Sequence, residues 1–336
     1  MDVERRKNMG FGRYIIKRFI IIFITLFVIV NLQFLIFQVL SPIDPARVVV
    51  PLTAPPALEK RLRELYGLDK PIWERYLLYI RNLYTLKFGI SFKSRNPVIK
   101  DIMTYLPNTL YLLGLALVIQ LVIGTIAGLT AASKRGGTLD VTIISFGLIS
   151  WAMPAFILQL LFRFTFVTWL KWFPYGGIPA PTTYFDYLSF NYLRDLFYHT
   201  ALPLATLVAM GFGIWAFYTR NLLVDVMTRD YILTARAKGV KEKTVVRKHA
   251  FRVILPTVLT FILMSFPGLL TGSIITEHIF SWPGIGWFLL DAISSSDYPV
   301  VQAMFFIYSI LTLSANFLAD LLYGYLDPRI RVGFRR

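Results

Sequence analysis

The chain has 336 residues, of which 56% are hydrophobic and 16% are charged, and its formal net charge is +16. This composition excludes an ordinary soluble globular protein and indicates an integral membrane protein. The basic residues gather at the ends of long apolar runs, which favours a role in membrane orientation and predicts no nucleic-acid partner. The chain contains no cysteine, which excludes disulfides, thiolate metal sites and cysteine catalysis.

The N-terminal segment predicts the first membrane span. Residues 1–18 carry six basic side chains and precede an apolar run over residues 19–40. A signal peptide also begins with basic residues, but this run is longer than a signal core and no small-residue cleavage pattern follows it. We therefore predict an uncleaved span at 19–40, with residues 1–18 in the cytosol.

The next stretch, residues 41–107, is more polar, with several prolines followed by a helical pattern at 57–68. It predicts a small extracytoplasmic domain. Its many Lys and Arg would by themselves favour the cytosol, but loops longer than about 60 residues follow the positive-inside rule only weakly.

Further apolar runs predict five more spans, at 108–132, 141–166, 201–223, 256–276 and 301–323. The central loop 224–255 and the tail 324–336 are rich in Lys and Arg, whereas the segment 171–199 carries two and 277–299 carries none. By the positive-inside rule both termini lie in the cytosol, which requires an even number of spans. Six spans satisfy this requirement.

The second span contains Gly124 and Gly128, a spacing that lets two helix backbones approach closely. The pair fits either packing within the chain or an interface between subunits.

The central loop predicts a helical hairpin. Residues 231–238 are rich in Ala and contain no Gly or Pro, and Asp230 places a carboxylate at the helix N-terminus. Gly239 is expected to end this helix in the left-handed conformation that glycine adopts without steric cost. A second short helix is expected at Lys241–Phe251, and Pro256 is expected to open the next span.

The segment that follows the fifth span, Thr276–Ala303, contains a proline and two glycines that favour a turn, and two tryptophans that suit a membrane interface. We predict a rigid re-entrant or interfacial loop. The residues concerned are Trp282, Pro283, Gly284, Gly286 and Trp287.

Several of these segments resemble the dipeptide and oligopeptide permease family of ABC importers. The central loop reads TARAKG at 234–239, followed by KHAFRVILP at 248–256, and resembles the "EAA" loop of that family, although Thr234 stands where the generic motif has Glu. The segment Thr276–Ala303 is also similar, as are FGISF at 88–92, LPNTL at 106–110 and LLYGYLDPRIR at 321–331.

The resemblance implies an all-α, type I ABC importer permease with six membrane helices, a permease core at 108–323 and a place in the cytoplasmic membrane of a prokaryote. It implies three kinds of partner: a second homologous permease, two cytosolic ABC ATPase subunits or domains that bind ATP and Mg, and an extracytoplasmic solute-binding protein. The residues that it assigns to coupling with the ATPase are Asp230, Thr234, Ala235, Arg236, Ala237, Lys238 and Gly239. The loop with Trp282, Pro283, Gly284 and Gly286 is expected to face the solute-binding protein.

No catalytic or metal-binding constellation stands in the sequence. The G-x-x-x-x-G-K-[ST] phosphate loop is missing, so ATP hydrolysis is expected in a partner chain, and the three histidines are far apart. Arg163 is a charge within an apolar span. It either lines the substrate pathway and attracts a substrate carboxylate, or snorkels or pairs with a neighbouring helix.

Peptides are the expected substrate, with oligosaccharides or nickel chelates as alternatives within the same machinery. A different class, an ATP-independent secondary transporter or channel, predicts ion-coupling carboxylates near mid-span. The candidates, Glu277 and Asp320, stand at span ends, where we expect solvation and a structural role. A membrane anchor without transport activity would not need the hairpin.

Overall fold

The computed structural model describes residues 2–40, 69–179 and 189–326. Every regular element in these three ranges is a helix, and extended pairing within them is limited to one isolated bridge between Ile90 and Pro97. The all-helical prediction is confirmed. The predicted helical pattern at 57–68 lies outside the described residues, as does most of the tail.

The helices follow one another along the chain, and three π-helical segments, labelled η, continue or join them. The elements are α1 (Asp2–Phe34), η1 (Leu35–Val39), α4 (Ile72–Tyr84), α5 (Val98–Ser133), α6 (Thr138–Ala152), α7 (Ala155–Arg163), η2 (Phe164–Trp169), α8 (Phe190–Val226), α9 (Asp230–Ala237), α10 (Glu242–Thr244), η4 (Val245–Ala250), α11 (Phe251–Ile279), α12 (Ile285–Ser294) and α13 (Tyr298–Leu326).

Four helical stretches are long and apolar enough to cross a membrane: Gly12–Val39, Val98–Ser133, Phe190–Val226 and Tyr298–Leu321. They coincide with the first, second, fourth and sixth predicted spans. The second and fourth begin well before the predicted residues 108 and 201, so the end of the predicted 41–107 domain belongs to α5. A membrane-spanning protein is therefore supported by the structure as well as by composition.

The third predicted span, 141–166, corresponds to two helices joined by a sharp bend. The stretches Thr138–Ala152 and Ala155–Trp169 are bent by 100° relative to each other. Pro154 explains the break, because proline disfavours the helical conformation of the residue before it. Met153 is extended, with φ −69° and ψ 132°.

Pro256 does not open a helix as predicted. The elements α10, η4 and α11 follow one another without a gap from Glu242 to Ile279, so Pro256 lies inside α11 and the expected separate helix at 241–251 is part of the same run. Helices that span membranes tolerate an internal proline because neighbouring groups satisfy the freed carbonyl. The polar segment before the fifth span is thus joined to it by continuous helix.

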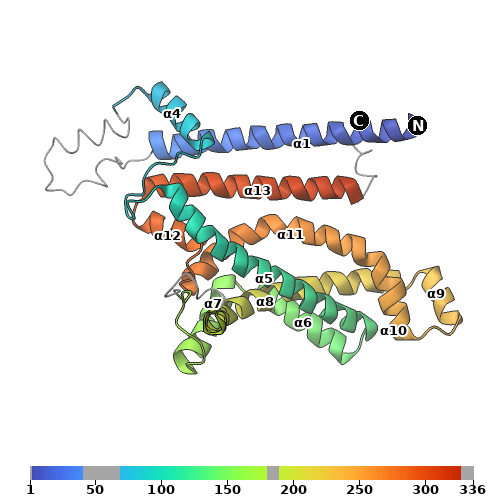
Figure 1. Cartoon of the computed structure of the whole chain (residues 1–336). Coiled ribbons are helices and arrows are strands. Elements are labelled where there is room, and N and C mark those ends of the chain that lie inside the picture. The colour runs from blue at the N-terminus through green and yellow to red at the C-terminus, as the bar shows by residue number, and fades with distance from the viewer. Residues whose placement is uncertain (1, 41–68, 180–188, 327–336) are drawn as a thin grey trace.

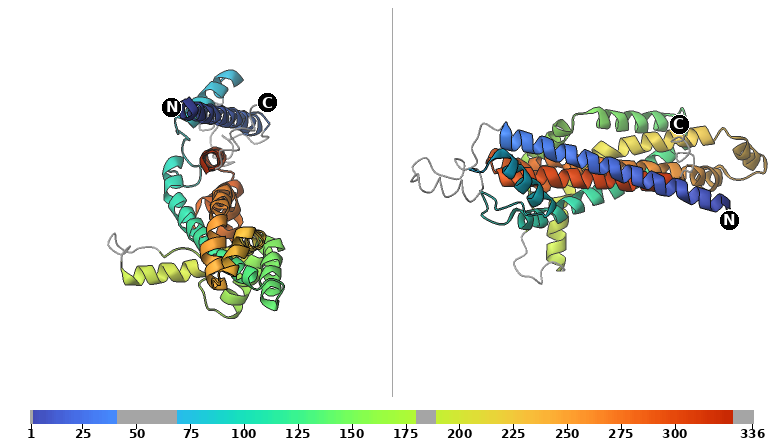
Figure 2. Two further views of the ribbon diagram at one scale, coloured as in Figure 1. Left: turned by 90° about the vertical axis from the view of Figure 1, so that its right-hand side faces the viewer. Right: turned by 90° about the horizontal axis from the view of Figure 1, so that it is seen from above.

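The two ends of the molecule carry different elements (Figure 1). The beginning of α1, the end of α13 and the segment with α9 and α10 lie at one end, whereas α4 and α12 lie at the other. Two further views show that α11 lies between α13 and the group formed by α5, α6 and α8 (Figure 2). This arrangement places the start of the first span and the end of the last one on the same side.

The first and last spans, α1 and α13, pack side by side in antiparallel directions (Figure 1). The Tyr14 hydroxyl donates a hydrogen bond to the Asp320 carbonyl at 3.3 Å, and the Arg18 guanidinium lies 3.0 Å from the Asp320 carboxylate. Much of the remaining surface of α1 is apolar and exposed, including Phe19 and Phe23. Such a surface fits contact with lipid.

The Gly124 and Gly128 pair serves packing within the chain. A Cβ atom at Gly124 would lie 2.4 Å from Trp215 Cβ, and one at Gly128 would lie 2.6 Å from the Ala216 carbonyl oxygen. Both neighbours belong to α8, so the two glycines let α5 and α8 touch backbone to backbone.

We expect Gly128→Ala to lower the free energy of unfolding by about 1–3 kcal/mol, because the added methyl group overlaps backbone that cannot easily move. Gly114→Ala is the matched control on the same helix, since nothing lies within 4 Å of a Cβ there. Its better helix propensity should add about 0.5–1 kcal/mol of stability. Unfolding in mixed micelles with increasing dodecyl sulfate measures both variants, and effects of the same sign would contradict the packing argument.

Candidate functional site

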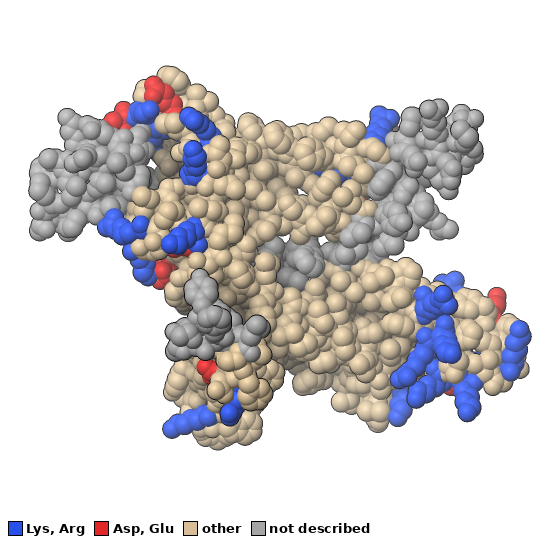
Figure 3. Space-filling model, in the orientation of Figure 1, with Lys and Arg blue, Asp and Glu red and all other residues tan. Residues whose placement is uncertain are grey.

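Charged side chains gather at the two ends of the molecule, and the middle of the face shown in Figure 3 is almost entirely uncharged. At one end many of the charges belong to the basic hairpin, by which we mean residues 230–250, comprising α9, the turn after it, α10 and η4. Its exposed basic side chains are Arg236, Lys238, Lys241, Lys243, Arg247 and Lys248. An uncharged band between charged ends is the pattern expected of a protein in a bilayer.

The basic hairpin is packed rather than extended into solvent. Helix α9 covers Asp230–Ala237, one residue earlier at each end than predicted, with Asp230 in its first turn. Ile232 and Ala235 are buried in one apolar cluster with Leu223 of α8 and Ile254 of α11. The hairpin is therefore fixed to the two long helices that lead into and out of it.

The turn after α9 has the predicted glycine geometry. Gly239 has φ +75°, nothing lies within 4 Å of a Cβ there, and its amide donates to the Arg236 carbonyl at 2.9 Å. The Val240 amide donates to the Ala235 carbonyl at 3.3 Å. A left-handed glycine followed by such hydrogen bonds ends the helix and reverses the chain.

An ion pair braces the same turn. Arg236 donates from Nε to Glu242 Oε2 at 3.1 Å and from Nη2 to Oε1 at 2.7 Å. These hydrogen bonds hold the pKa of the Glu242 carboxyl below its ordinary value. A guanidinium and a carboxylate joined by two parallel bonds have a defined orientation.

Glu242→Gln is expected to lower stability at pH 7 by less than about 1 kcal/mol, because solvent screens an ion pair this exposed. Since the folded-state pKa is depressed, the pair contributes fully above the ordinary Glu range and is lost as the pH falls through the lowered pKa. Unfolding at pH 7 and at pH 3 measures the difference. A destabilisation that grew towards low pH would contradict this account.

Arg163, the last residue of α7, has a partner within the chain. Its Nη1 donates to the backbone carbonyl of Ile279, the last residue of α11. A cation at a helix C-terminus is favoured by the helix dipole. One turn earlier, Gln159 donates to the Thr276 hydroxyl at 2.6 Å. These bonds tie α7 to the end of α11, far along that helix from the basic hairpin.

The residues predicted to face a solute-binding protein lie inside the packing. Trp282 has no exposed surface, Gly284 and Gly286 are buried and Pro283 is half-buried. Trp282 packs against the protein rather than facing outward, and its indole N–H donates to the Asn108 carbonyl at 3.1 Å. Trp282, Gly284 and Gly286 therefore offer little surface for contact with another protein, whereas Pro283 stays partly exposed, and a position facing the solute-binding protein stays a prediction.

Glu277 has structural contacts, as predicted, but it is buried although solvation was expected to be cheap at a span end. It is 0% exposed, and its carboxylate accepts hydrogen bonds from the Thr109 hydroxyl at 2.8 Å and from the amides of Gly286 at 2.7 Å and Trp287 at 3.0 Å. The sequence around Glu277 gives no indication of its partner Thr109, which lies 168 residues away in the chain. Asp320 does have the structural role predicted for it, through Arg18.

A second buried carboxylate, Asp140, went unnoticed in the sequence. It lies in the first turn of α6, is 3% exposed, and accepts from Arg220 Nε at 3.1 Å and Nη2 at 2.7 Å. The Gly136 amide also donates to it at 2.9 Å. The pair joins α6 to α8 shortly before α8 leads into the basic hairpin.

Known proteins match nearly the whole chain. Residues 120–332 match the family described as binding-protein-dependent transport system inner membrane component, and residues 11–113 match its N-terminal region. The chain is 35% identical over 318 residues to the glutathione transport system permease protein GsiC of Escherichia coli K12, covering 95% of this chain and 98% of that protein. It is 34% identical over 318 residues to the oligopeptide transport system permease protein AppB of Bacillus subtilis 168, covering 94% and 98%.

The two matched regions together contain the basic hairpin, the α5 residues that bond to the segment after α11, and that segment itself. The relatives match along almost their full length. The chain therefore belongs to the binding-protein-dependent transport system inner membrane components, as a multi-pass ABC importer permease of the dipeptide and oligopeptide type.

Proposed function

We propose that this chain is one of two membrane permeases of an ABC importer that carries peptides into the cytosol. The basic hairpin carries the proposal, because it is a compact projection fixed to two long helices and continuous with one of them. The substrate class is supported by relatives named as glutathione and oligopeptide permeases.

The proposed topology has six spans. The four long helices and the bent pair α6–α7 supply five, and α11, with 29 residues and a length of roughly 44 Å, supplies the sixth. The start of α1 and the end of α13 lie at the basic end of the molecule, which agrees with an even number of spans and with both termini in the cytosol (Figure 1). The opposite end, with α4 and α12, would then be extracytoplasmic.

The proposed partners follow from the two ends. At the cytosolic end the hairpin docks on an ABC ATPase, which binds ATP and Mg. Thr234, Arg236 and Lys238 are exposed and available for docking, whereas Ala235 is buried and acts through packing. At the other end a solute-binding protein delivers the peptide, and a second homologous permease completes the pathway.

A pull-down of the tagged chain from detergent-solubilised native membranes, followed by mass spectrometry, tests this function. We expect recovery of an ABC ATPase and a second permease, and of a solute-binding protein when peptide is present. If the chain were recovered alone and moved solute in liposomes without ATP, a secondary transporter would replace the importer.

The pathway role of Arg163 stays a prediction, and Arg163→Gln separates it from the anchoring role. Since Arg163 already bonds to the Ile279 carbonyl, we expect the KM for peptide uptake to stay within about twofold and the melting temperature to fall, because a bond to a helix end is lost. Uptake kinetics in proteoliposomes measure the first quantity. A tenfold or larger rise in KM at unchanged stability would establish attraction of a substrate carboxylate instead.

A further inference from the structure

Two sequence motifs far apart in the chain meet at the α4 and α12 end, and the proposed function leaves them without a role. They are LPNTL at 106–110 in α5, and the segment from Thr276 to Trp287 at the end of α11 and the start of α12. We call their contact the α5–α12 joint and define it by Asn108, Thr109, Glu277, Trp282 and Ile285–Trp287.

Asn108 and Thr109 make the α5 side of the joint. The Asn108 side-chain amide donates to the Pro283 carbonyl at 2.7 Å, and its backbone carbonyl accepts from the Trp282 indole. The Thr109 hydroxyl donates to Glu277 and accepts from the Ile285 amide at 2.9 Å. Two adjacent residues thus hold both the turn and the first residue of α12.

Glu277 connects the three helices. Its Oε1 accepts a hydrogen bond from the Thr109 hydroxyl, and its Oε2 accepts hydrogen bonds from the amides of Gly286 and Trp287. These two amides lie in the first turn of α12, where N–H groups have no partner within the helix. A carboxylate in this position is also favoured by the helix dipole. Because Glu277 belongs to α11, a single side chain ties α11 to α5 and to the N-terminus of α12.

Two glycines make room for the carboxylate. A Cβ at Gly284 would lie 2.4 Å from both Glu277 Oε2 and Thr109 Oγ1, and one at Gly286 would lie 2.6 Å from Ile274 Cα. Both distances are far shorter than a normal contact. The turn residues assigned from sequence to a partner protein therefore fit the buried carboxylate.

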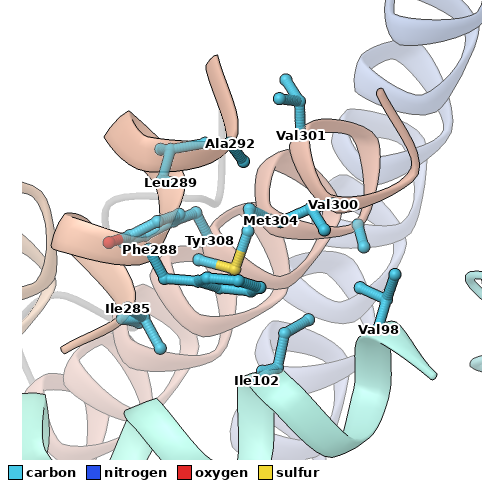
Figure 4. Packing of buried hydrophobic residues seen from close by; sticks show 11 residues of the cluster. Val98, Ile102, Ile285, Phe288, Leu289, Ala292, Val300, Val301, Met304 and Tyr308 are labelled. Atoms are coloured by element: carbon cyan, nitrogen blue, oxygen red, sulfur yellow. The ribbon is translucent and has the colours of Figure 1, made fainter. Parts of the chain in front are cut away.

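Helix α12 moves little without its neighbours, because it is packed and bonded along its length. Ile285, Phe288 and Leu289 share a buried cluster with the start of α5 and the start of α13 (Figure 4). Farther along, Asp291 lies 2.6 Å from Lys93 Nζ, and Asp297 accepts from the Ser91 hydroxyl at 2.5 Å. The loop around residue 91, α12 and the start of α13 form one connected unit.

The other end of α11 leads to the basic hairpin. From Glu242 to Ile279 the chain is helical without a gap, and Glu277 stands two residues before the end of that run. A displacement of the hairpin can therefore reach Glu277 along one continuous helical run, and packed helices can pass small shifts over long distances.

We propose that Glu277 is a positioning residue for transport: through Thr109 and the N-terminus of α12 it fixes the α12 unit to α11, so that movement of the basic hairpin repositions α12. The proposal rests on the proposed function, because the hairpin moves only if an ATPase acts on it. Glu277 acts on α12 and does not contact the peptide.

The test uses spin labels in the complete transporter, reconstituted with its partner permease, ATPases and solute-binding protein. The chain has no native cysteine, so Ile293→Cys on α12 and Ile149→Cys on α6 give one labelled pair per chain at exposed sites. Helix α6 contributes no residue to the joint, whereas α5 does, so the label on α6 serves as the reference for movement of α12. Pulsed electron spin resonance measures the interlabel distance.

In the labelled transporter with an unaltered joint, the interlabel distance should change when ATP is added. Glu277→Gln and Thr109→Val should lose this change and lower peptide uptake about tenfold or more, while basal ATP hydrolysis stays within about twofold. Thr109→Ser, which keeps the hydroxyl, should restore both. The matched control is Gln120→Met, which removes a buried hydrogen bond between α5 and α8 away from the joint and should keep the ATP-dependent change.

The outcomes separate the inference from the function on which it rests. If the protein with an unaltered joint shows no ATP-driven uptake, the proposed function fails and the inference fails with it. If uptake and the ATP-dependent distance change are both normal in Glu277→Gln and Thr109→Val, the inference alone is overturned. If Glu277→Gln does not assemble, the result for Thr109→Val decides whether the inference holds. If Gln120→Met also loses the ATP-dependent distance change, the effect is not specific to the joint and the inference is overturned.

Discussion

Replacing Asp140 with Ala is expected to lower the free energy of unfolding by about 1.5–3 kcal/mol, because hydrogen bonds between charged groups are lost. Asp140 is almost fully buried and receives two hydrogen bonds from Arg220 and one from the Gly136 amide. Without the carboxylate, the Arg220 guanidinium, a quarter of whose side chain is exposed, keeps only its hydrogen bond to Asn221 among those described. Unfolding in mixed micelles with dodecyl sulfate measures the loss.

Two controls identify the cause of that loss. Removing both charges, in Asp140→Leu with Arg220→Leu, should recover most of the stability, because a buried ion pair can often be replaced by apolar side chains at little cost. Asp225→Ala removes the exposed partner of Arg229 and should change stability very little. A double variant as unstable as Asp140→Ala would show that packing, rather than the unpaired guanidinium, explains the effect.

Gly239→Val is expected to reduce ATP-driven peptide uptake at least tenfold while the permease still inserts and assembles. Gly239 has φ +75°, a conformation that a β-branched residue adopts only at a cost of about 1–2 kcal/mol, so the turn after α9 must shift and move Arg236 and Lys238. ATP hydrolysis and uptake, measured together in proteoliposomes, give the number of ATP molecules used per peptide. We expect this ratio to rise.

Gly177 offers a matched control for that substitution. It has φ +86° and nothing lies within 4 Å of a Cβ there, but it belongs to the segment between η2 and α8. Gly177→Val therefore carries similar backbone strain outside the basic hairpin and should leave the ratio of ATP to peptide unchanged. Equal uncoupling by both substitutions would refute a specific role of the hairpin turn.

Much of the fold could be predicted because lipid imposes simple rules. Runs of about 20 apolar residues mark spans, and the Ala-rich segment between Asp230 and Gly239 gave the limits of α9 to within one residue. The prolines were harder to interpret than the apolar runs. Pro154 ends α6, whereas Pro107 and Pro203 lie inside α5 and α8. Which prolines break a helix depends on neighbours that satisfy the freed carbonyls, and these neighbours are unknown before the chain is folded.

In the candidate site, too, one part could be predicted from the sequence and another part could not. The basic hairpin is local, and its helix, glycine and charges stand within 21 consecutive residues, 230–250. The α5–α12 joint is not local, since Thr109 and Glu277 are 168 residues apart. The position of Glu277 at the end of an apolar run indicated that solvation would be cheap, and only the packing of α5 against α12 shows that its carboxylate is buried. Contacts of this kind cannot be read from one sequence.

The pairing of α1 with α13 has a consequence for biosynthesis. Helix α1 ends at Phe34 and α13 begins at Tyr298, so about 260 residues are translated between them. At roughly 5–20 residues per second this takes about 15–50 s. During that interval the nascent first helix resides in the bilayer without the neighbour that later contacts Tyr14 and Arg18. Because apolar side chains cover nearly every face of α1, it is stable in the bilayer as a single helix during this interval.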